Sequence, residues 1–200
     1  MKTARGKSFN IEDFKFGSRE LRMKRVTMYL LLVVLSLLFV AGCSAYSDMN
    51  GTVIDGESGK PIEGAVVLVE WTKTKGIGLT HTESFKVQEV ITDKDGKFVV
   101  SGVSDPFVNA PDLTIYKQGY VCWNNKYIFP DSSVRSDFKW MSGVVIKLDH
   151  FLEQKYSHSD HVMYIRNSIH SGSPKGEKRL MESAIRREEL MSVKETSHSK

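Results

Sequence analysis

The sequence contains little cysteine: only Cys43 and Cys122 occur in 200 residues. Small exported domains that cannot build a large core are commonly held by several disulfides, and two cysteines cannot supply such a framework. The fold must therefore be held by packing, for which the chain is long enough. We expect Cys122 to behave as a small buried apolar residue and not as a reactive thiol.

Motifs that would identify an enzyme or a nucleotide-binding protein are also missing. Gly59-Lys60 lacks the other residues of a phosphate loop, Asp93–Gly96 is too short for a calcium loop, and no Gly-x-Ser-x-Gly occurs. His81-Thr82-Glu83 lacks the cysteine pair of a deaminase zinc site. The sequence therefore indicates no catalytic site and no cofactor.

The positive charge of the chain is confined to its beginning. Residues 1–42 hold eight Lys/Arg and three Asp/Glu, which gives them a formal charge of +5. The whole chain has a formal net charge of +4, so residues 43–200 carry −1. Binding to nucleic acid depends on neutralising several phosphates. The sequence thus argues against a nucleic-acid partner.

One long apolar run, residues 26–42, follows the basic Met23-Lys24-Arg25. It is short for a permanent membrane span of about 20 residues and closes with small residues, which is typical of an export signal. A signal that starts at Met23 has ordinary proportions, so the sequence leaves open whether Met1 or Met23 is the true start. Residues 1–42 are predicted to be the N-terminal extension and the signal peptide, with the apolar run forming a signal helix.

The end of this run, Val40-Ala41-Gly42-Cys43, resembles the bacterial lipobox. Small side chains admit the signal peptidase, and a cysteine thiolate is the nucleophile that takes up a diacylglyceryl group. The resemblance implies lipidation of Cys43, which becomes the first residue of the mature protein, and attachment to a membrane by two or three acyl chains. The alternative is an uncleaved membrane anchor that happens to end in a cysteine.

The residue after Cys43 is Ser44 and not Asp. This resembles lipoproteins that are released to the outer membrane of Gram-negative cells. We therefore expect the mature protein in the bacterial cell envelope, with residues 43–48 as a short tether.

Residues 49–148 alternate between short strand-forming runs and turn clusters. About seven strands at this spacing indicate a mainly β fold, an Ig-like or transthyretin-like β-sandwich. Asp93–Gly96 between two runs is a hairpin signal. The expected strands are 49–55, 64–71, 85–92, 97–101, 113–117, 121–129 and 144–148.

Four motifs in this region carry a further resemblance. The chain contains Gly51–Asp55, Gly59–Val67, Thr92–Phe98 and Gly119-Tyr120, in that order. Together they resemble the carboxypeptidase regulatory-like domain, a transthyretin-like sandwich. Two departures are a long connection between Trp71 and Phe85 and a polar sixth run at residues 123–126.

Histidines suggest two metal sites, both weak. His150-Phe151-Leu152-Glu153 spells the His-x-x-Glu of zinc carboxypeptidases, but about fifty following residues are too few for a catalytic domain. His158 and His161 can share a helix face and form a second candidate site. Because solvated histidines at a helix end explain the same spacing, we predict no metal and keep these two as a weak alternative.

Residues 149–200 change to helical patterns. Ser159 is expected to cap a helix that extends to about Ser168, and Ser173-Pro174 to open a second helix. Both helices have one narrow apolar face, which indicates packing on the sandwich or on each other, with a partner-binding role as the alternative. A disordered tail is expected after Val193.

Two functions are compatible with these features. The first is a non-enzymatic, membrane-anchored envelope lipoprotein whose sandwich is a structural or protein-interaction module. The second is a module that binds cell-wall or surface glycans, because aromatic rings can stack on sugars. The candidate ligand contacts are Trp71, Trp123 and Tyr127.

Overall fold

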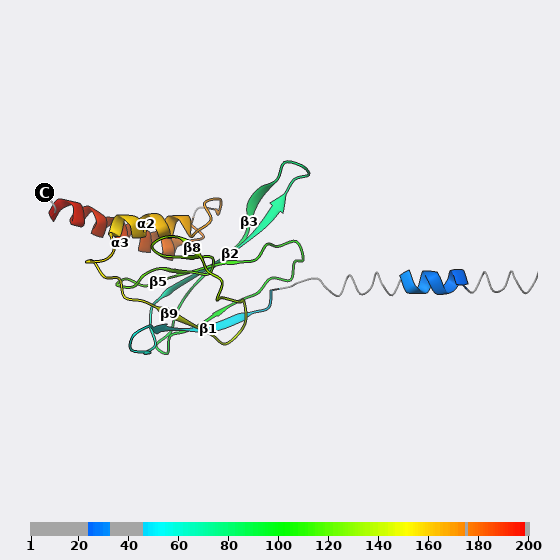
Figure 1. The fold of residues 1–200 in the computed structure, drawn as a ribbon, viewed down its shortest axis with the longest axis horizontal. Coiled ribbons are helices and arrows are strands. Elements are labelled where there is room, and N and C mark those ends of the chain that lie inside the picture. The colour runs from blue at the N-terminus through cyan, green and yellow to red at the C-terminus, as the bar shows by residue number, and fades with distance from the viewer. Residues whose placement is uncertain (1–23, 33–45, 175, 199–200) are drawn as a thin grey trace, which may run out of the picture. The chain divides into compact units, whose positions relative to one another are not determined.

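The computed structural model of the protein describes residues 24–32, 46–174 and 176–198 (Figure 1). The chain separates into two compact units, Met1–Ser44 and Ala45–Lys200. In the first unit, residues 24–32 are helical and lie within the predicted signal peptide. No helix in the described part of the chain is long and apolar enough to cross a membrane.

Two β-sheets build the second unit. The first has the order β4 (Lys97–Val100), β1 (Met49–Asp55), β9 (Val144–Leu148), and β1 runs antiparallel to β4 but parallel to β9. The second has the order β3 (His81–Ile91), β2 (Val66–Lys75), β5 (Asp112–Tyr116), β6 (Trp123–Asn124), and its neighbours are antiparallel. The predicted mainly β sandwich followed by helices is confirmed.

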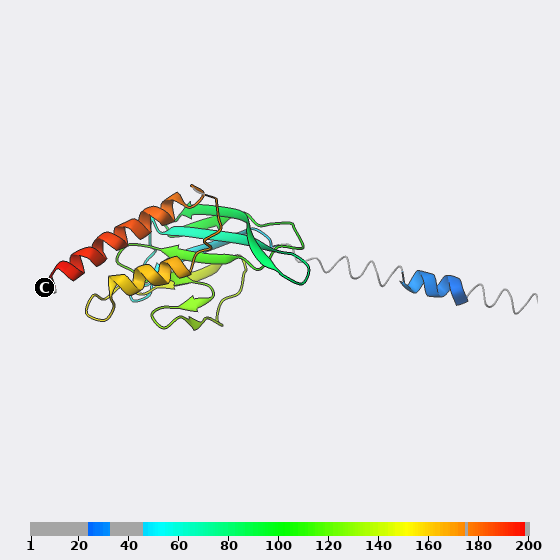
Figure 2. The ribbon, with the colours of Figure 1, turned by 90° about the horizontal axis from the view of Figure 1, so that it is seen from above.

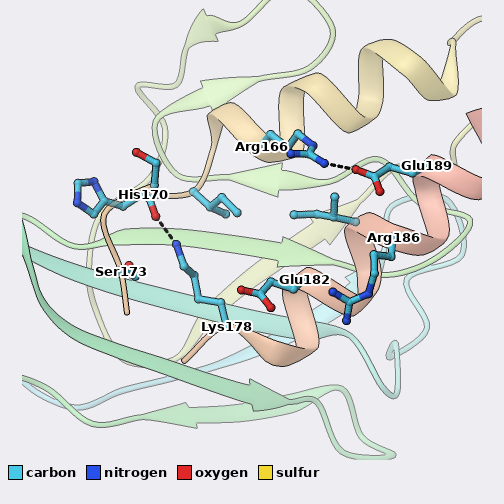
Figure 3. A pocket seen from close by; sticks show the side chains of 10 residues that line it. Arg166, His170, Ser173, Lys178, Glu182, Arg186 and Glu189 are labelled. Atoms are coloured by element: carbon cyan, nitrogen blue, oxygen red, sulfur yellow. Dashed lines mark hydrogen bonds and ion pairs between the residues drawn. The ribbon is translucent and has the colours of Figure 1, made fainter. Parts of the chain in front are cut away.

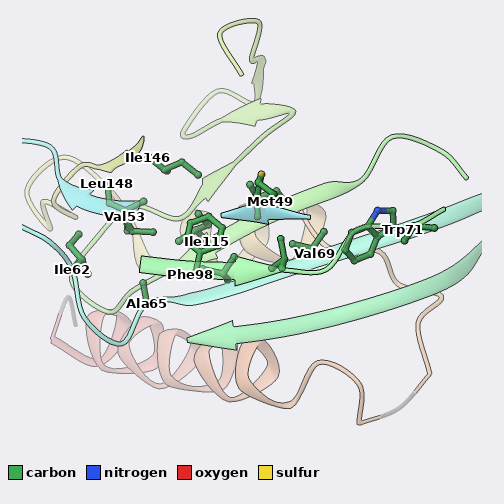
Figure 4. Packing of buried hydrophobic residues seen from close by; sticks show 14 of the residues in the cluster. Met49, Val53, Ile62, Ala65, Val69, Trp71, Phe98, Ile115, Ile146 and Leu148 are labelled. Atoms are coloured by element: carbon green, nitrogen blue, oxygen red, sulfur yellow. The ribbon is translucent and has the colours of Figure 1, made fainter. Parts of the chain in front are cut away.

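An apolar core fills the space between these sheets (Figure 4). Alternate residues point inward because successive side chains of a strand face opposite sides of the sheet. Met49 and Val53 enter from β1, and Val67, Val69 and Trp71 enter from β2, all fully buried. Other members come from β4, β5 and β9, namely Phe98, Val100, Leu113, Ile115, Ile146 and Leu148.

The predicted sixth strand, 121–129, is broken into two pieces. Asn124 ends β6, and its side-chain Oδ1 accepts hydrogen bonds from the backbone N–H of Lys126 at 2.8 Å and Tyr127 at 3.0 Å. This local turn redirects the chain, as asparagine side chains commonly do. The second piece, β7 (Tyr127–Ile128), pairs with β8 (Ser133–Val134) in a separate small hairpin.

The hairpin expected at Asp93–Gly96 is also wrong in its pairing. The turn itself forms, since Asp93 Oδ1 accepts hydrogen bonds from the N–H groups of Asp95 and Lys97. However, β3 pairs with β2 and β4 pairs with β1, so the turn carries the chain from one sheet to the other. β3 is the edge strand of the second sheet, so the tight turn reverses the chain but does not fix the partner of β4, which joins β1 instead.

The β2–β3 hairpin is longer than expected. Its pairing continues from Trp71 outward to Lys75 opposite His81, with a register irregularity between Trp71 and Thr72. Most side chains beyond Thr72 are exposed, so this part has no alternating apolar pattern from which a strand could be predicted. Figure 1 shows the hairpin extending away from the sandwich.

Two helices form a third layer on the second sheet (Figures 1 and 2). They are α2 (His158–Asn167) and α3 (Arg179–His198). The N-cap of α2 is Ser157 and not Ser159, because the Ser157 side chain accepts hydrogen bonds from the N–H groups of Ser159 and Asp160. α3 begins at Arg179, later than the start expected at Ser173-Pro174, and continues to His198, past the position where a tail was expected.

A second apolar cluster holds the helices to the sheet. Leu68 of β2 and Tyr116 of β5 pack against Ile165 of α2 and Met181 and Ile185 of α3. The expectation that the helices pack on the sandwich is confirmed. The outer face of this sheet is therefore a buried interface in the described part of the chain.

Candidate functional site

The predicted lipidation motif, Val40, Ala41, Gly42 and Cys43, lies outside the described residues. The described residues of the second unit begin at Tyr46, which is paired with the sandwich. Its N–H donates to Val103 O at 2.9 Å, and the Val103 N–H donates to Tyr46 O at 2.7 Å. Three residues after Cys43, the chain is thus already attached to the folded unit.

Trp71 does not present a ring to a ligand, which corrects the expectation from the sequence. Its side chain is 0% exposed, and Trp140 packs edge-on against it at 6.0 Å between ring centroids. Its Nε1–H is buried and has no hydrogen-bond partner. The physical reason is its position on β2, where it faces the inner core together with Val67 and Val69.

Trp123 lies in a better position for binding. It lines a cleft of about 500 Å³ together with Arg135, Phe138 and Lys147 among other residues. The Arg135 guanidinium lies 4.7 Å from the centre of the Trp123 ring, and Phe138 packs edge-on at 5.3 Å. The cleft thus combines an aromatic wall with charged groups that can form hydrogen bonds.

Tyr127 is 42% exposed but is not among the residues that line this cleft. Its backbone oxygen accepts a hydrogen bond from the Tyr164 hydroxyl at 2.7 Å, which connects β7 to α2. The structure therefore does not bring Trp71, Trp123 and Tyr127 together into one aromatic platform.

The two histidines of α2 participate in a buried network. His161 is fully buried, and its Nε2 accepts the backbone N–H of Cys122 at 2.9 Å. His158 Nδ1 lies 2.8 Å from Glu188 Oε2, and His161 Nδ1 lies 3.5 Å from the same oxygen. These are not the solvated helix-end histidines that the sequence suggested, because both bind within the protein.

Glu188 of α3 is the centre of this network. Tyr116 donates its hydroxyl to Glu188 Oε1 at 2.5 Å. Burial by itself raises the pKa of Glu188, but the nearby His161 imidazole and the hydrogen bonds with Tyr116 and His158 outweigh it and lower the pKa to about 2. An ionised carboxylate therefore joins α3 to α2 and to the sheet.

Cys122 is buried beside the same network. Burial, with a smaller contribution from the charge of Glu188, raises the pKa of the Cys122 thiol. The thiolate, which is the reactive form, is accordingly disfavoured.

A second buried carboxylate, Glu70 of β2, binds the segment between the helices, which contributes His170, Ser173 and Lys178 to the cavity drawn in Figure 3. Lys178 Nζ lies 2.9 Å from Glu70 Oε1, the Ser173 hydroxyl donates to the same oxygen at 3.0 Å, and the His170 N–H donates to Oε2 at 2.8 Å. Lys178 also donates to the His170 carbonyl oxygen. Lys178 and His170 line a cavity of about 450 Å³ with Arg166, Glu182, Arg186 and Glu189.

A third carboxylate holds the start of α3. The two oxygens of Glu89 on β3 accept the N–H groups of Leu180 at 2.9 Å and Met181 at 2.8 Å. The first N–H groups of a helix lack partners within the helix, and a negative charge at this end is favourable. The sequence did not identify Glu70, Glu89 or Glu188, because their partners are distant in sequence.

The His-x-x-Glu residues do not form a site together. His150 Nε2 lies 2.8 Å from Asp55 Oδ2, which also accepts the Tyr120 hydroxyl at 2.9 Å, whereas Glu153 lies 3.8 Å from His158. Hydrogen bonds from Ser58 and Tyr120 lower the pKa of Asp55. Among the described residues, no group of three or more His, Cys, Asp or Glu is arranged to hold a metal ion.

Comparison with known proteins gives no family. No family model matches the chain, and no curated protein matches it either. The resemblances to the lipobox and to the carboxypeptidase regulatory-like domain therefore remain predictions.

Some solved structures are similar to part of the chain. The pilus 2b backbone protein of group B streptococcus has a TM-score of 0.33 and 13% identity over 55% of this chain and 43% of its own. The shaft pilin SpaA from Lactobacillus rhamnosus GG has a TM-score of 0.31 and 17% identity over 55% of this chain and 47% of its own. A streptococcal ancillary pilin has a TM-score of 0.29 and 20% identity over 52% of this chain and 29% of its own. This chain thus matches less than half the length of each of these pilins.

Proposed function

We propose that this chain is a non-enzymatic lipoprotein of the bacterial cell envelope, anchored through Cys43, whose folded unit is a structural or protein-interaction module. The observation that carries the proposal is the attachment at Tyr46, which follows the predicted lipidation site by three residues. A lipid on Cys43 would hold the rigid unit directly at the membrane surface. The residue Ser44 favours the outer membrane as its destination.

The use of the buried titratable groups supports a non-enzymatic role. Glu70, Glu188 and His161 bind side chains and backbone groups of the same unit. A catalytic group needs free access to a substrate, whereas these groups hold α2 and α3 on the sheet. Their arrangement is explained by a role in holding the unit together and does not require a catalysed reaction.

The anchor is tested by growth of cells with labelled fatty acid. Wild type and Cys122→Ala should incorporate the label, and Cys43→Ala should not. Cys122→Ala is the matched control, because it removes the other cysteine of the chain. Unchanged labelling of Cys43→Ala would refute the anchor.

The interaction role is tested by crosslinking in intact cells followed by purification of the lipidated protein. A specific protein partner that is captured by wild type and remains bound after washing in high salt is the expected result. Recovery of the protein without any specific partner would argue against an interaction module.

Glycan binding is a second candidate function, and the Trp123 cleft favours it. A sugar can stack on an aromatic ring and form hydrogen bonds with Arg135 and nearby charged side chains. Co-sedimentation with purified sacculi and surface polysaccharide should then be saturable for wild type and be lost in Trp123→Ala. Trp123→Phe, which retains an aromatic ring, is the matched control. Equal binding of all three proteins would exclude this cleft.

A further inference from the structure

The tip of the β2–β3 hairpin exposes apolar side chains to an unusual degree. Ile77 is 104% exposed and Leu79 is 92% exposed, within the five-residue connection 76–80. Gly76 and Gly78 have positive φ values of 103° and 84°, and a Cβ at Gly76 would lie 2.2 Å from the Leu79 oxygen. The tip is therefore a tight turn that holds both aliphatic side chains outward.

One further exposed apolar side chain lies at the same end of the sandwich. Phe107, which is 81% exposed, lies in the connection 101–111 between β4 and β5. This connection contacts the hairpin, because Val108 bridges to Lys73 and the Asn109 N–H donates to Thr72 O at 2.8 Å. Phe107 therefore lies nearer the Thr72–Lys73 level of the hairpin, and we call Ile77 and Leu79 the tip surface.

The same connection reaches the point where the chain enters the sandwich. Val103 pairs with Tyr46, and the Gly102 N–H donates to Asp48 Oδ1 at 2.8 Å. Lys86 of β3, which is opposite Trp71, donates to the Gly102 oxygen at 3.0 Å. The Trp71 level of the hairpin and Asp48 therefore lie at the same end, and Figures 1 and 2 both place the hairpin tip at the end where β1 begins.

The lengths of the tether and of the hairpin agree. Five residues separate Cys43 from Asp48, and a fully extended chain spans at most about 3.6 Å per residue, so this tether reaches about 18 Å at most. Five residues also separate Trp71 from Gly76, and a strand rises about 3.4 Å per residue, so the tip extends about 17 Å past the Trp71 level. At full extension the two lengths agree to within about 1 Å, so a lipid on Cys43 would hold the bilayer at about the same distance from Asp48 as the hairpin reaches.

We propose that the tip surface contacts the lipid bilayer as a second, non-covalent attachment, with Ile77 and Leu79 inserted among the headgroups. This proposal rests on the lipid anchor of the proposed function. Aliphatic side chains gain free energy when they leave water, and large exposed apolar surfaces commonly mark contact sites. Lys75, the last residue of β2, supplies positive charge that anionic lipids attract, whereas the charge of Lys73 is paired with Asp105.

The experiment uses the lipidated full chain in vesicles of phosphatidylethanolamine and phosphatidylglycerol. Ile77→Cys carries an environment-sensitive fluorophore, and Glu57→Cys is the matched control, because it lies in the turn after β1, at the opposite end of that strand. Cys122 is buried and stays unlabelled. Lipids with a nitroxide near the headgroup should quench the label at position 77 at least about threefold more than the label at position 57.

The outcomes separate the two proposals. A protein that does not float with the vesicles contradicts the lipid anchor. A protein that floats but shows equal quenching at positions 77 and 57 overturns the membrane contact and leaves the anchor intact. Strong crosslinking of position 77 to an envelope protein in intact cells, together with no quenching by lipid in the vesicles, would assign the tip surface to a protein partner and also overturn the proposal.

A second measurement tests the side chains themselves. In the lipidated chain, Ile77→Ser/Leu79→Ser should raise the rate of transfer between vesicles about tenfold, because two inserted aliphatic groups are lost. Val134→Ser, which changes an exposed valine of β8, is the control and should transfer as wild type does. Equal rates for all three proteins would contradict insertion.

Discussion

The two faces of β2 are buried in different ways. Val67, Val69 and Trp71 face the other sheet in an apolar core, whereas Leu68 and Glu70 face the helices, where Glu70 binds Lys178. Apolar packing stabilises the inner core, but it does not require particular pairs of atoms to meet in a fixed orientation. The helix layer also contains charged groups, which are expensive to bury unless each finds its partner. The carboxylates Glu70, Glu89 and Glu188 therefore define where the helices attach.

The largest predicted effect breaks the ion pair of the helix layer. Lys178→Met leaves Glu70 buried without its counter-charge and should reduce the free energy of unfolding by about 3–5 kcal/mol. Urea denaturation followed by circular dichroism measures the loss. Limited proteolysis should cut the segment around α3 while the sandwich remains resistant.

Two controls separate charge from packing. Glu70→Gln/Lys178→Met removes both charges and should recover most of the lost stability. Leu113→Ala, in the inner core, should cost about 2–5 kcal/mol without selective cleavage near α3. If Lys178→Met unfolds the whole unit in one step with no early cleavage, the helix layer does not unfold independently of the sandwich.

Acid should weaken the helix layer in a defined pH range. The pKa of Glu188 is lowered from 4.5 to about 2 in the folded protein, so its contribution is fully present above pH 4.5 and is lost as the pH falls toward 2. By linkage this contribution is on the order of 3 kcal/mol. The urea midpoint, measured between pH 7 and pH 3, should decrease.

Glu188→Gln is the matched variant for this pH dependence. It should start with a lower stability at pH 7 and lose less on acidification. Some dependence will remain, because the pKa of Asp55 is also lowered. A curve for Glu188→Gln parallel to that of wild type would show that Glu188 does not link the helices to pH.

The smallest predicted effect concerns the start of α2. Ser157→Ala removes the side chain that accepts two backbone N–H groups and should cost about 1 kcal/mol. Ser159→Ala should change stability by less than about 0.5 kcal/mol, because it only removes an exposed hydroxyl. A larger loss of stability for Ser159→Ala than for Ser157→Ala would support Ser159 as the N-cap, as the sequence suggested.

The inner core was predictable from the sequence, whereas the polar helix layer was not. Strands β1 and β9 were predicted with their observed bounds, because alternating or continuous apolar residues identify buried strands. The apolar faces of the helices also predicted that they pack on the sandwich. Glu70 could not be identified, since a glutamate next to an apolar run normally points to solvent and its partner Lys178 is distant in sequence.

Local turns explain the remaining errors. A run of strand-forming residues around Asn124 predicts one strand, but the Asn124 side chain ends it by binding the next N–H groups. Asp93–Gly96 predicts a tight turn, which forms, but the turn does not determine which strands pair. Trp71 has the size and chemistry of a sugar platform, and only its register on β2 shows that it is buried.

The parallel pairing of β1 with β9 has a consequence for the order of folding. Gly51 pairs with Val144 and Asp55 with Leu148, so the sheet that contains the first strand cannot close until nearly all of the sandwich sequence has emerged. Long-range pairing of this kind is slow compared with local structure. If the chain is exported and lipidated as proposed, β1 would thus still lack its β9 partner when Cys43 is modified.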